Sequence, residues 1–261
     1  MRGRFLTCLA AALVLAAAAS SSPPARSQPL PRPIDDTEET CTVTSLFPAA
    51  AYVPVIDSGD EITVDLFLVG DRGIGEYRMG ELVARAQKAY KPLGMRLNIV
   101  GSQQVVLEGT DSQVLIDQAK ALFPDGERPP GADAVLIFTS VNLTNSTGDG
   151  VAGQADCVGG IEFPRKSFVI IEDDEPDTPW EYEGVTMFGQ TAAKIVAHEL
   201  AHLFGAHHQY ANCVEGIPSE LDQSEASPCT VMFNDVGLVS LAFSTLEATV
   251  VRGYALEHLG S

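Results

Sequence analysis

Residues 198–208 read His-Glu-Leu-Ala-His-Leu-Phe-Gly-Ala-His-His and contain four of the five histidines in the chain. His198 and His202 are four positions apart, so on a helix their rings project from one face and can bind one zinc ion. Glu199 is rotated by about 100° around that helix, which places its carboxylate beside the metal, where it can accept a proton from a bound water. This segment therefore predicts a helix that carries a metal site.

Gly205 lies where this helix is expected to end. Glycine adopts a positive φ without the strain that a Cβ atom causes, so the chain can turn back there and bring a third ligand to the metal. The residues after the turn leave more than one choice for that ligand. A histidine follows the turn, and a downstream carboxylate such as Glu215 or Glu220 is the alternative.

Upstream of the histidines, apolar residues repeat at strand spacing and at helical spacing in turn. The pattern predicts strands at residues 62–69, 95–107 and 134–138 and helices at residues 79–90 and 112–123. The segment between Val151 and Ile161 is Gly-rich and polar enough to form a strand at the edge of a sheet. A fifth strand is expected at residues 167–171.

Two further helices are expected in the second half of the chain. One spans residues 186–204 and carries the histidine segment. The other begins at Ser244 and Glu247, which have the spacing of a capping box, and runs towards Gly260. The alternation of strands and helices predicts an α/β fold, a five-stranded, mostly parallel, twisted sheet with helices packed against it.

The first 60 residues differ in composition from the rest. Arg2 and Arg4 precede an apolar run at residues 5–19, which is shorter than a membrane span and typical of a signal peptide at residues 1–22. Residues 23–60 are rich in proline and acidic side chains and are expected to form an extended or disordered segment, a candidate propeptide, before a single domain at residues 61–261. The protein is therefore expected to be secreted, or periplasmic in a Gram-negative bacterium.

The charge of the chain narrows the classes of partner. It has 261 residues, with 16 Lys and Arg against 35 Asp and Glu, and a formal net charge of -19 at pH 7. Such an excess of negative charge argues against binding to nucleic acid or to an anionic membrane surface. The sequence leaves the oligomeric state open.

Four cysteines remain when the signal peptide, which contains Cys8, is removed. These are Cys41, Cys157, Cys213 and Cys229. An even number in an exported chain predicts two disulfides, for which three pairings exist and of which Cys213 with Cys229 is the most local. Cys41 could instead cap the metal as an inhibitory thiolate, but no surrounding motif supports that interpretation.

The segment His198 to His208 matches HExxHxxGxxH position for position and resembles the zinc motif of the metzincin metallopeptidases. The resemblance implies that His198, His202 and His208 bind zinc, that Glu199 is the general base, and that Gly205 makes the turn. The resemblance to metzincins also includes the order of the expected strands and helices along the domain. His207 is then a neighbour of the third ligand and not itself a ligand.

The resemblance also assigns a role to Met232. Metzincins have a methionine turn beneath the zinc, and Cys-Thr-Val-Met ends at Met232, 24 residues after His208. A methionine that merely packs in the core is the alternative. Cys213 and Cys229 follow the zinc motif and precede the methionine turn, which resembles the reprolysin, or adamalysin, branch. Gln209 departs from that branch, which commonly has aspartate at this position.

The function implied by this resemblance is that of a secreted zinc metalloendopeptidase with one catalytic zinc ion. A water activated by the zinc and Glu199 would attack a peptide carbonyl, with the polypeptide substrate extended along the edge strand between Val151 and Ile161. A secreted protein that keeps the fold and the zinc but cleaves nothing is the alternative. Calcium binding by the acidic run at residues 172–177 has only weak support, because the ligand spacing of a calcium loop is absent.

Overall fold

The computed structural model describes residues 59–173, 179–182, 185–188, 191–208, 230–232 and 241–259. Its strands are β1 Ile62–Asp71, β2 Met95–Val105, β3 Ala134–Thr139, β4 Gly153–Ala155, β5 Phe168–Glu172, β6 Pro179–Tyr182 and β7 Val185–Phe188. Its α-helices are α2 Glu76–Tyr90, α3 Ser112–Lys120, α4 Thr191–Leu203 and α5 Thr245–Leu259. Short 3-10 turns are present at Lys91–Leu93, Pro124–Gly126 and Gly160–Glu162.

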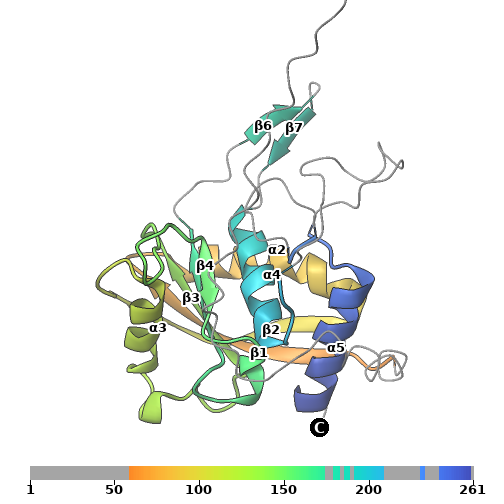
Figure 1. Cartoon of the computed structure of the whole chain (residues 1–261), viewed down its shortest axis with the longest axis horizontal. Coiled ribbons are helices and arrows are strands. Elements are labelled where there is room, and N and C mark those ends of the chain that lie inside the picture. Colours follow the sequence, from red (N-terminus) through yellow and green to blue (C-terminus); the bar gives the residue numbers. More distant parts are fainter. Residues whose placement is uncertain are drawn as a thin grey trace, which may run out of the picture. The chain divides into compact units, whose positions relative to one another are not determined.

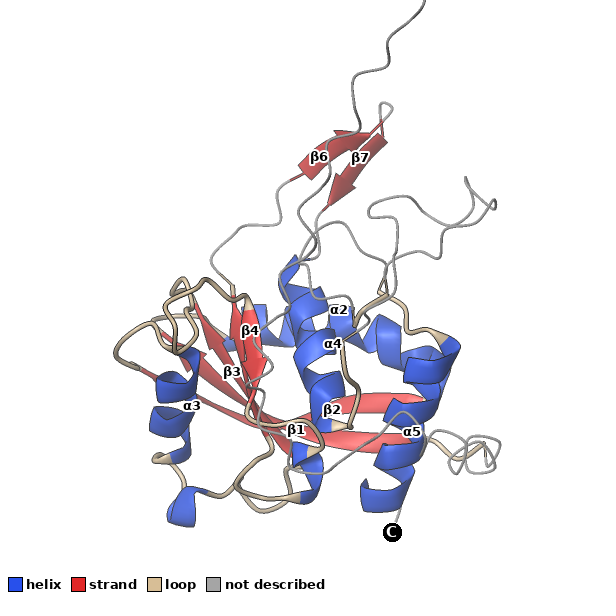
Figure 2. Cartoon of the chain, viewed as in Figure 1, coloured by secondary structure: helices blue, strands red, loops and turns tan. Residues whose placement is uncertain are grey.

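Strands β1 to β5 form one sheet in the order β2-β1-β3-β5-β4 (Figure 2). The four longer strands are parallel, and β4 pairs antiparallel with β5 at the edge. Parallel strands need long crossover connections, which the helices α2 and α3 supply. The predicted α/β fold with a five-stranded, mostly parallel sheet is confirmed.

The two faces of the sheet contact different helices (Figure 1). Leu136 and Phe138 of β3 belong to a core cluster that includes side chains of α2, α4 and α5. Val135 and Ile137 alternate with them and belong to a second cluster with α3. All six residues of β3 are buried, which explains why this strand reads as a continuous apolar run.

The strand predicted between Val151 and Ile161 is shorter than expected. Only Gly153–Ala155 pairs as β4, and Gly160–Glu162 forms a 3-10 turn. Gly159 has a φ of 80°, which turns the chain away from the extended conformation. The predicted strand therefore ends at Ala155, and the chain has left the extended conformation by Gly159.

The helix predicted from residue 186 begins later than expected. Val185–Phe188 is the strand β7, paired antiparallel with β6, and α4 starts at Thr191. β6 and β7 form a separate two-stranded sheet. Val185 and Thr186 are β-branched and favour a strand when a partner strand is available. The apolar spacing within one segment does not show that partner.

The capping box predicted at the last helix is present. The backbone N–H of Ser244 donates to Oε2 of Glu247 at 2.7 Å, and the backbone N–H of Glu247 donates to Oγ of Ser244 at 3.3 Å. Each side chain thus satisfies a backbone donor that has no partner inside the helix.

The predicted signal peptide at residues 1–22 and nearly all of the segment at residues 23–60 lie outside the described residues, so both stay predictions. Within the described part of the chain, no helix is both long and apolar enough to cross a membrane.

Candidate metal centre

Helix α4 carries the first two histidines of the motif on its buried face. His198 is 7 % exposed and His202 is fully buried. The helix ends as the motif predicts, because Gly205 has a φ of 80°. The backbone N–H of Gly205 donates to the carbonyl of His202, and that of Ala206 to the carbonyl of Ala201, which is the hydrogen-bond pattern of a glycine-terminated helix. This turn brings His208 back towards the helix.

The Nε2 atoms of His198, His202 and His208 form a nearly equilateral triangle. The separations are 3.1 Å between His198 and His202, 3.2 Å between His202 and His208, and 3.1 Å between His208 and His198. These three residues form a group of ligand atoms that could hold one metal ion. The histidine after the turn therefore belongs to the cluster, whereas the alternative carboxylates, Glu215 and Glu220, lie outside the described residues.

Backbone carbonyls indicate which ring nitrogen of His198 and His202 can bind a metal. Nδ1 of His198 lies 2.7 Å from the carbonyl oxygen of Val231, and Nδ1 of His202 lies 2.7 Å from that of Ala206. A carbonyl oxygen can only accept, so both Nδ1 atoms carry hydrogen. In the neutral rings, the Nε2 lone pairs then point into the triangle, which is the arrangement that a metal ligand needs.

Burial favours these neutral rings. Burial, and next the charges of His202 and His208, lower the pKa of His198 well below its usual value. Burial also lowers the pKa of His202 to about 4, against the opposing effect of its hydrogen bond to Ala206. At neutral pH both rings are therefore uncharged, with hydrogen on Nδ1 and none on Nε2, the form in which histidine binds a metal.

The donor set fits zinc. Three neutral imidazoles at a tetrahedral zinc, with Zn–N bonds of about 2.0–2.1 Å, would place their nitrogens about 3.3 Å apart, and the observed separations are only slightly shorter. Three converging lone pairs repel each other unless a cation lies between them. Three protein ligands, the number that the described residues supply, would leave a coordination position open, as catalytic zinc sites do.

The turn that contains Met232 lies against this centre. Met232 is fully buried and belongs to the core cluster that α4 shares with the sheet. The preceding residue, Val231, supplies the carbonyl that orients His198, and its own N–H donates to the carbonyl of Ala242 at 2.9 Å. Sequence reasoning identified Met232 but missed Val231, because a backbone carbonyl leaves no trace in the side-chain pattern.

Comparison with known families identifies the chain. The model of the reprolysin-like metallopeptidases of family M12B matches residues 77–209, about half of the chain, and includes the whole histidine motif. The chain belongs to this family. No curated protein matches it in sequence.

This metallopeptidase is similar to two solved structures at low sequence identity. Archaemetzincin from Methanopyrus kandleri is 19% identical, with a TM-score of 0.49, over 77% of this chain and 98% of its own. Metalloproteinase-II from Bacteroides fragilis is 13% identical, with a TM-score of 0.45, over 73% of this chain and 52% of its own.

Glu199 of the metallopeptidase is buried between two elements that the motif does not include. It is 6 % exposed, and its side chain lies directly against Gly153 of β4. On α2, burial and then the charge of Glu199 raise the pKa of Tyr90 well above its usual value. The Tyr90 hydroxyl donates to the carbonyl of Ala197 at 2.7 Å. Sequence reasoning missed Gly153 and Tyr90 as neighbours of the centre, because both are distant from the motif along the chain.

The remaining predicted sites are only partly within the described residues. Cys157 is buried and forms a disulfide. Its partner lies outside the described residues, as do Cys41, Cys213 and Cys229, so the pairing stays a prediction.

The acidic run proposed for calcium begins with two carboxylates that have protein partners. Asp173 accepts two hydrogen bonds from Arg78, at 2.8 and 2.7 Å, and Glu172 accepts one from the N–H of Leu143 at 2.6 Å. Residues 174–177 lie outside the described residues, so nothing in the described part of the run adds support for calcium.

Proposed function

We propose that this metallopeptidase is a secreted zinc endopeptidase in which Glu199 is the general base. The observation that carries the proposal is the triangle of Nε2 atoms from His198, His202 and His208, with Glu199 next to the first of them on α4. The family supports a metallopeptidase in general. The family match does not specify internal cleavage or the role of Glu199, and both belong to the proposal.

The three histidines would hold the zinc, which would supply the positive charge that acidifies a water and polarises a peptide carbonyl. Glu199 would accept the proton of that water as the water attacks the carbonyl carbon, and would then give the proton to the departing amine. The carbonyls of Val231 and Ala206 keep the histidine rings in place throughout. No side chain of the protein forms a covalent bond to the substrate in this route.

The edge strand β4 would hold the substrate. The carbonyl of Ala152 accepts a hydrogen bond from Glu172, and the N–H of Asp156 donates to Phe168, so these two residues face β5. Backbone groups alternate in direction along a strand, so the N–H and C=O of Gly153 and Ala155 face away from the sheet. An extended peptide can add to these groups as a further strand.

Export is supported by the composition of residues 1–22 and by the disulfide at Cys157, because disulfides persist in oxidising compartments. Mass spectrometry of the purified secreted protein would show a new N-terminus after about residue 22. Retention of residues 1–22 would contradict the proposed signal peptide.

The direct test is incubation of a mixed peptide library with the zinc-loaded chain, followed by mass spectrometry of the products. Glu199→Gln at matched zinc content should abolish internal cuts, because the amide cannot accept the proton. Glu108→Gln, which changes an exposed carboxylate outside the centre, should leave the cuts unchanged.

Two results would contradict the proposal. Internal cuts that persist in Glu199→Gln would remove Glu199 from the role of base. No cuts by the zinc-loaded parent, with or without residues 23–60, would favour the alternative of a zinc-containing binding protein on the same fold.

A further inference from the structure

Gly153 of β4 lies where the edge strand meets the helix of the metal centre. A Cβ atom built at this position would be 2.5 Å from Cγ2 of Ile195 and 2.9 Å from both Cγ and Oε1 of Glu199. Carbon and oxygen atoms of packed side chains do not approach this closely, so any other residue would displace one of these groups. The strand backbone therefore borders directly on the carboxylate of Glu199.

Space, and not backbone conformation, is the reason for a glycine here. Gly153 does not have a positive φ, whereas Gly159 and Gly205 do. Gly153 has the conformation of an ordinary paired strand residue opposite Ile171. An alanine could adopt that conformation without strain and would differ only by the methyl group that meets α4.

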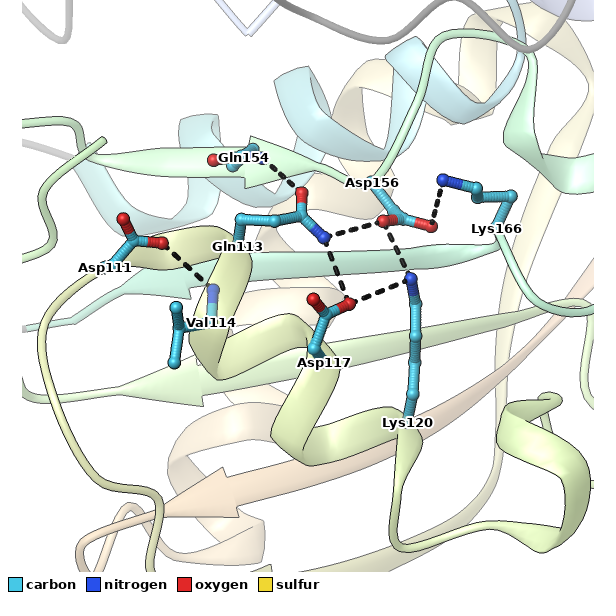
Figure 3. A network of polar contacts seen from close by, with 8 residues as sticks. All are labelled: Asp111, Gln113, Val114, Asp117, Lys120, Gln154, Asp156 and Lys166. Atoms are coloured by element: carbon cyan, nitrogen blue, oxygen red, sulfur yellow. Dashed lines mark hydrogen bonds and ion pairs between the residues drawn. The ribbon is translucent and has the colours of Figure 1, made fainter. Parts of the chain in front are cut away.

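The strand cannot easily move away from α4, because polar side chains hold it from the other face (Figure 3). Gln154 accepts a hydrogen bond from the hydroxyl of Ser112 and donates one to Oε1 of Gln113 at 2.9 Å. Asp156, just after β4, accepts hydrogen bonds from Gln113 at 3.0 Å and from Lys120 at 2.9 Å. These contacts attach β4 to α3.

A methyl group at residue 153 would therefore be accommodated mainly on the α4 side. Oε1 is the end of a flexible side chain, so the carboxylate of Glu199 is the group that moves at least cost. Ile195 is also buried, but it is β-branched, so its Cγ2 can move only by rotation about a stiff χ1. The histidine rings are held separately by Val231 and Ala206 and would keep their positions.

We propose that Gly153 is a positioning residue for Glu199. The missing side chain leaves the space that the carboxylate of Glu199 occupies against β4, and it allows a substrate strand paired with β4 to lie close to that carboxylate. This inference rests on the proposed function, since it needs Glu199 to act as the base. It adds to that function a residue of the edge strand that sets the rate without binding the metal.

The test compares five zinc-loaded proteins on one internally quenched peptide that the parent cleaves: the parent, Gly153→Ala, Gly150→Ala, Ile195→Ala, and the double variant of Gly153 and Ile195. Gly153→Ala should lower kcat at least about tenfold while KM changes by less than about threefold, because a displaced base slows proton transfer more than it weakens binding. Gly150→Ala is the matched control, since a Cβ there meets nothing within 4 Å.

Two readouts separate positioning from damage to the fold. Zinc content and the visible spectrum of the cobalt(II)-loaded protein should be the same in Gly153→Ala as in the parent, because the histidines do not move. The double variant lacks Cγ2 of residue 195 and thus the 2.5 Å contact, so it tests the same point if Gly153→Ala alone does not fold. Its kcat should stay at least about tenfold below that of Ile195→Ala.

Three results would overturn the inference alone: a parent-like kcat in Gly153→Ala, an altered cobalt spectrum in that variant, or a double variant as fast as Ile195→Ala. In the last case the loss would arise from helix packing and not from Glu199. A zinc-loaded parent that cleaves no peptide would instead contradict the proposed function, and the inference would fail with it.

Discussion

At the scale of single residues, backbone carbonyls prepare the centre for a metal. The carbonyls of Val231 and Ala206 fix hydrogen on Nδ1 of His198 and His202, and this leaves both Nε2 lone pairs directed at His208. The ligands are therefore oriented by the folded chain and do not need the metal to choose their tautomers. Such preorganisation lowers the entropic cost of binding.

Loss of the third histidine should remove most of the zinc affinity. Removal of a group that only supports a ligand lowers metal affinity about 10- to 100-fold, so His208→Ala should cost at least about 100-fold. Titration of the apoprotein with zinc against a chelator of known affinity would measure this. His207→Ala should stay within about threefold of the parent. If His207→Ala lost more zinc affinity than His208→Ala, the assignment of the third ligand would be wrong.

Tyr90 should make the fold sensitive to alkaline pH. Its pKa is raised in the folded protein, chiefly by burial and then by Glu199, so the folded state keeps the proton that the unfolded state releases near pH 10. The contribution of the neutral phenol is complete below about pH 10 and is lost as pH rises towards the folded pKa. Urea unfolding at pH 9 to 11 should show a steeper loss of stability for the parent than for Tyr90→Phe.

The matched control for this prediction is Tyr77→Phe, because Tyr77 is 86 % exposed. Tyr77→Phe should follow the parent curve. Equal slopes for the parent and Tyr90→Phe would show that Tyr90 titrates normally in the folded protein. At pH 7, Tyr90→Phe should lose about 1 kcal/mol through the hydrogen bond to Ala197.

At the scale of elements, the first turn of α5 supports the metal centre. Glu247 accepts the N–H of Ser244 through Oε2 and the hydroxyl of Thr230 through Oε1, at 2.7 and 2.8 Å. Thr230 precedes Val231, whose carbonyl orients His198. One carboxylate thus joins the start of a helix to the turn beneath the zinc ligands.

Variants of this capping box should separate its two roles. Ser244→Ala removes only a cap and should lower the free energy of unfolding by about 1 kcal/mol without changing zinc affinity. Glu247→Ala removes the cap and the contact to Thr230, so it should also weaken zinc binding about tenfold. Denaturant unfolding and zinc titration of both variants would decide this. Equal zinc affinities in the two variants would contradict a link between α5 and the centre.

At the scale of the whole molecule, the metal centre belongs to the larger of the two core clusters. That cluster joins one face of the sheet to α2, α4 and α5 and includes Met232. Zinc would therefore connect α4 to the segment at His208 in the folded state, and the unfolded chain would not present the three nitrogens together. Metal binding and folding should be coupled.

Removal of zinc should accordingly lower thermal stability. At free zinc near 1,000 times the dissociation constant, the metal should add about 4 kcal/mol to the free energy of unfolding, or roughly 10 °C in the midpoint. Calorimetry of the holoprotein with and without a chelator would measure this, and readded zinc should restore the midpoint. A midpoint that does not respond to zinc would contradict the proposed site, and His208→Ala should have the midpoint of the chelated parent.

Local patterns predicted most of the fold. Apolar spacing located β1, β3 and β5 to within a few residues, and the capping box at Ser244 marked the start of α5. These patterns succeed because the residues that make each element are neighbours along the chain. The edge strand was predicted to end too late, because a 3-10 turn forms at Gly160–Glu162. Helix α4 was predicted to begin too early, because residues 185–188 pair with β6 instead.

The sequence by itself predicted the three histidines that the structure brings together, the helix that carries two of them, and the glycine turn that returns the third. Helical spacing and the freedom of glycine are local properties, so they can be read along the chain. Only the tertiary structure brought Gly153 against Glu199 and the carbonyl of Val231 against a histidine ring. Such contacts join distant segments through packing and backbone hydrogen bonds, and neither depends on a side-chain pattern that the sequence displays.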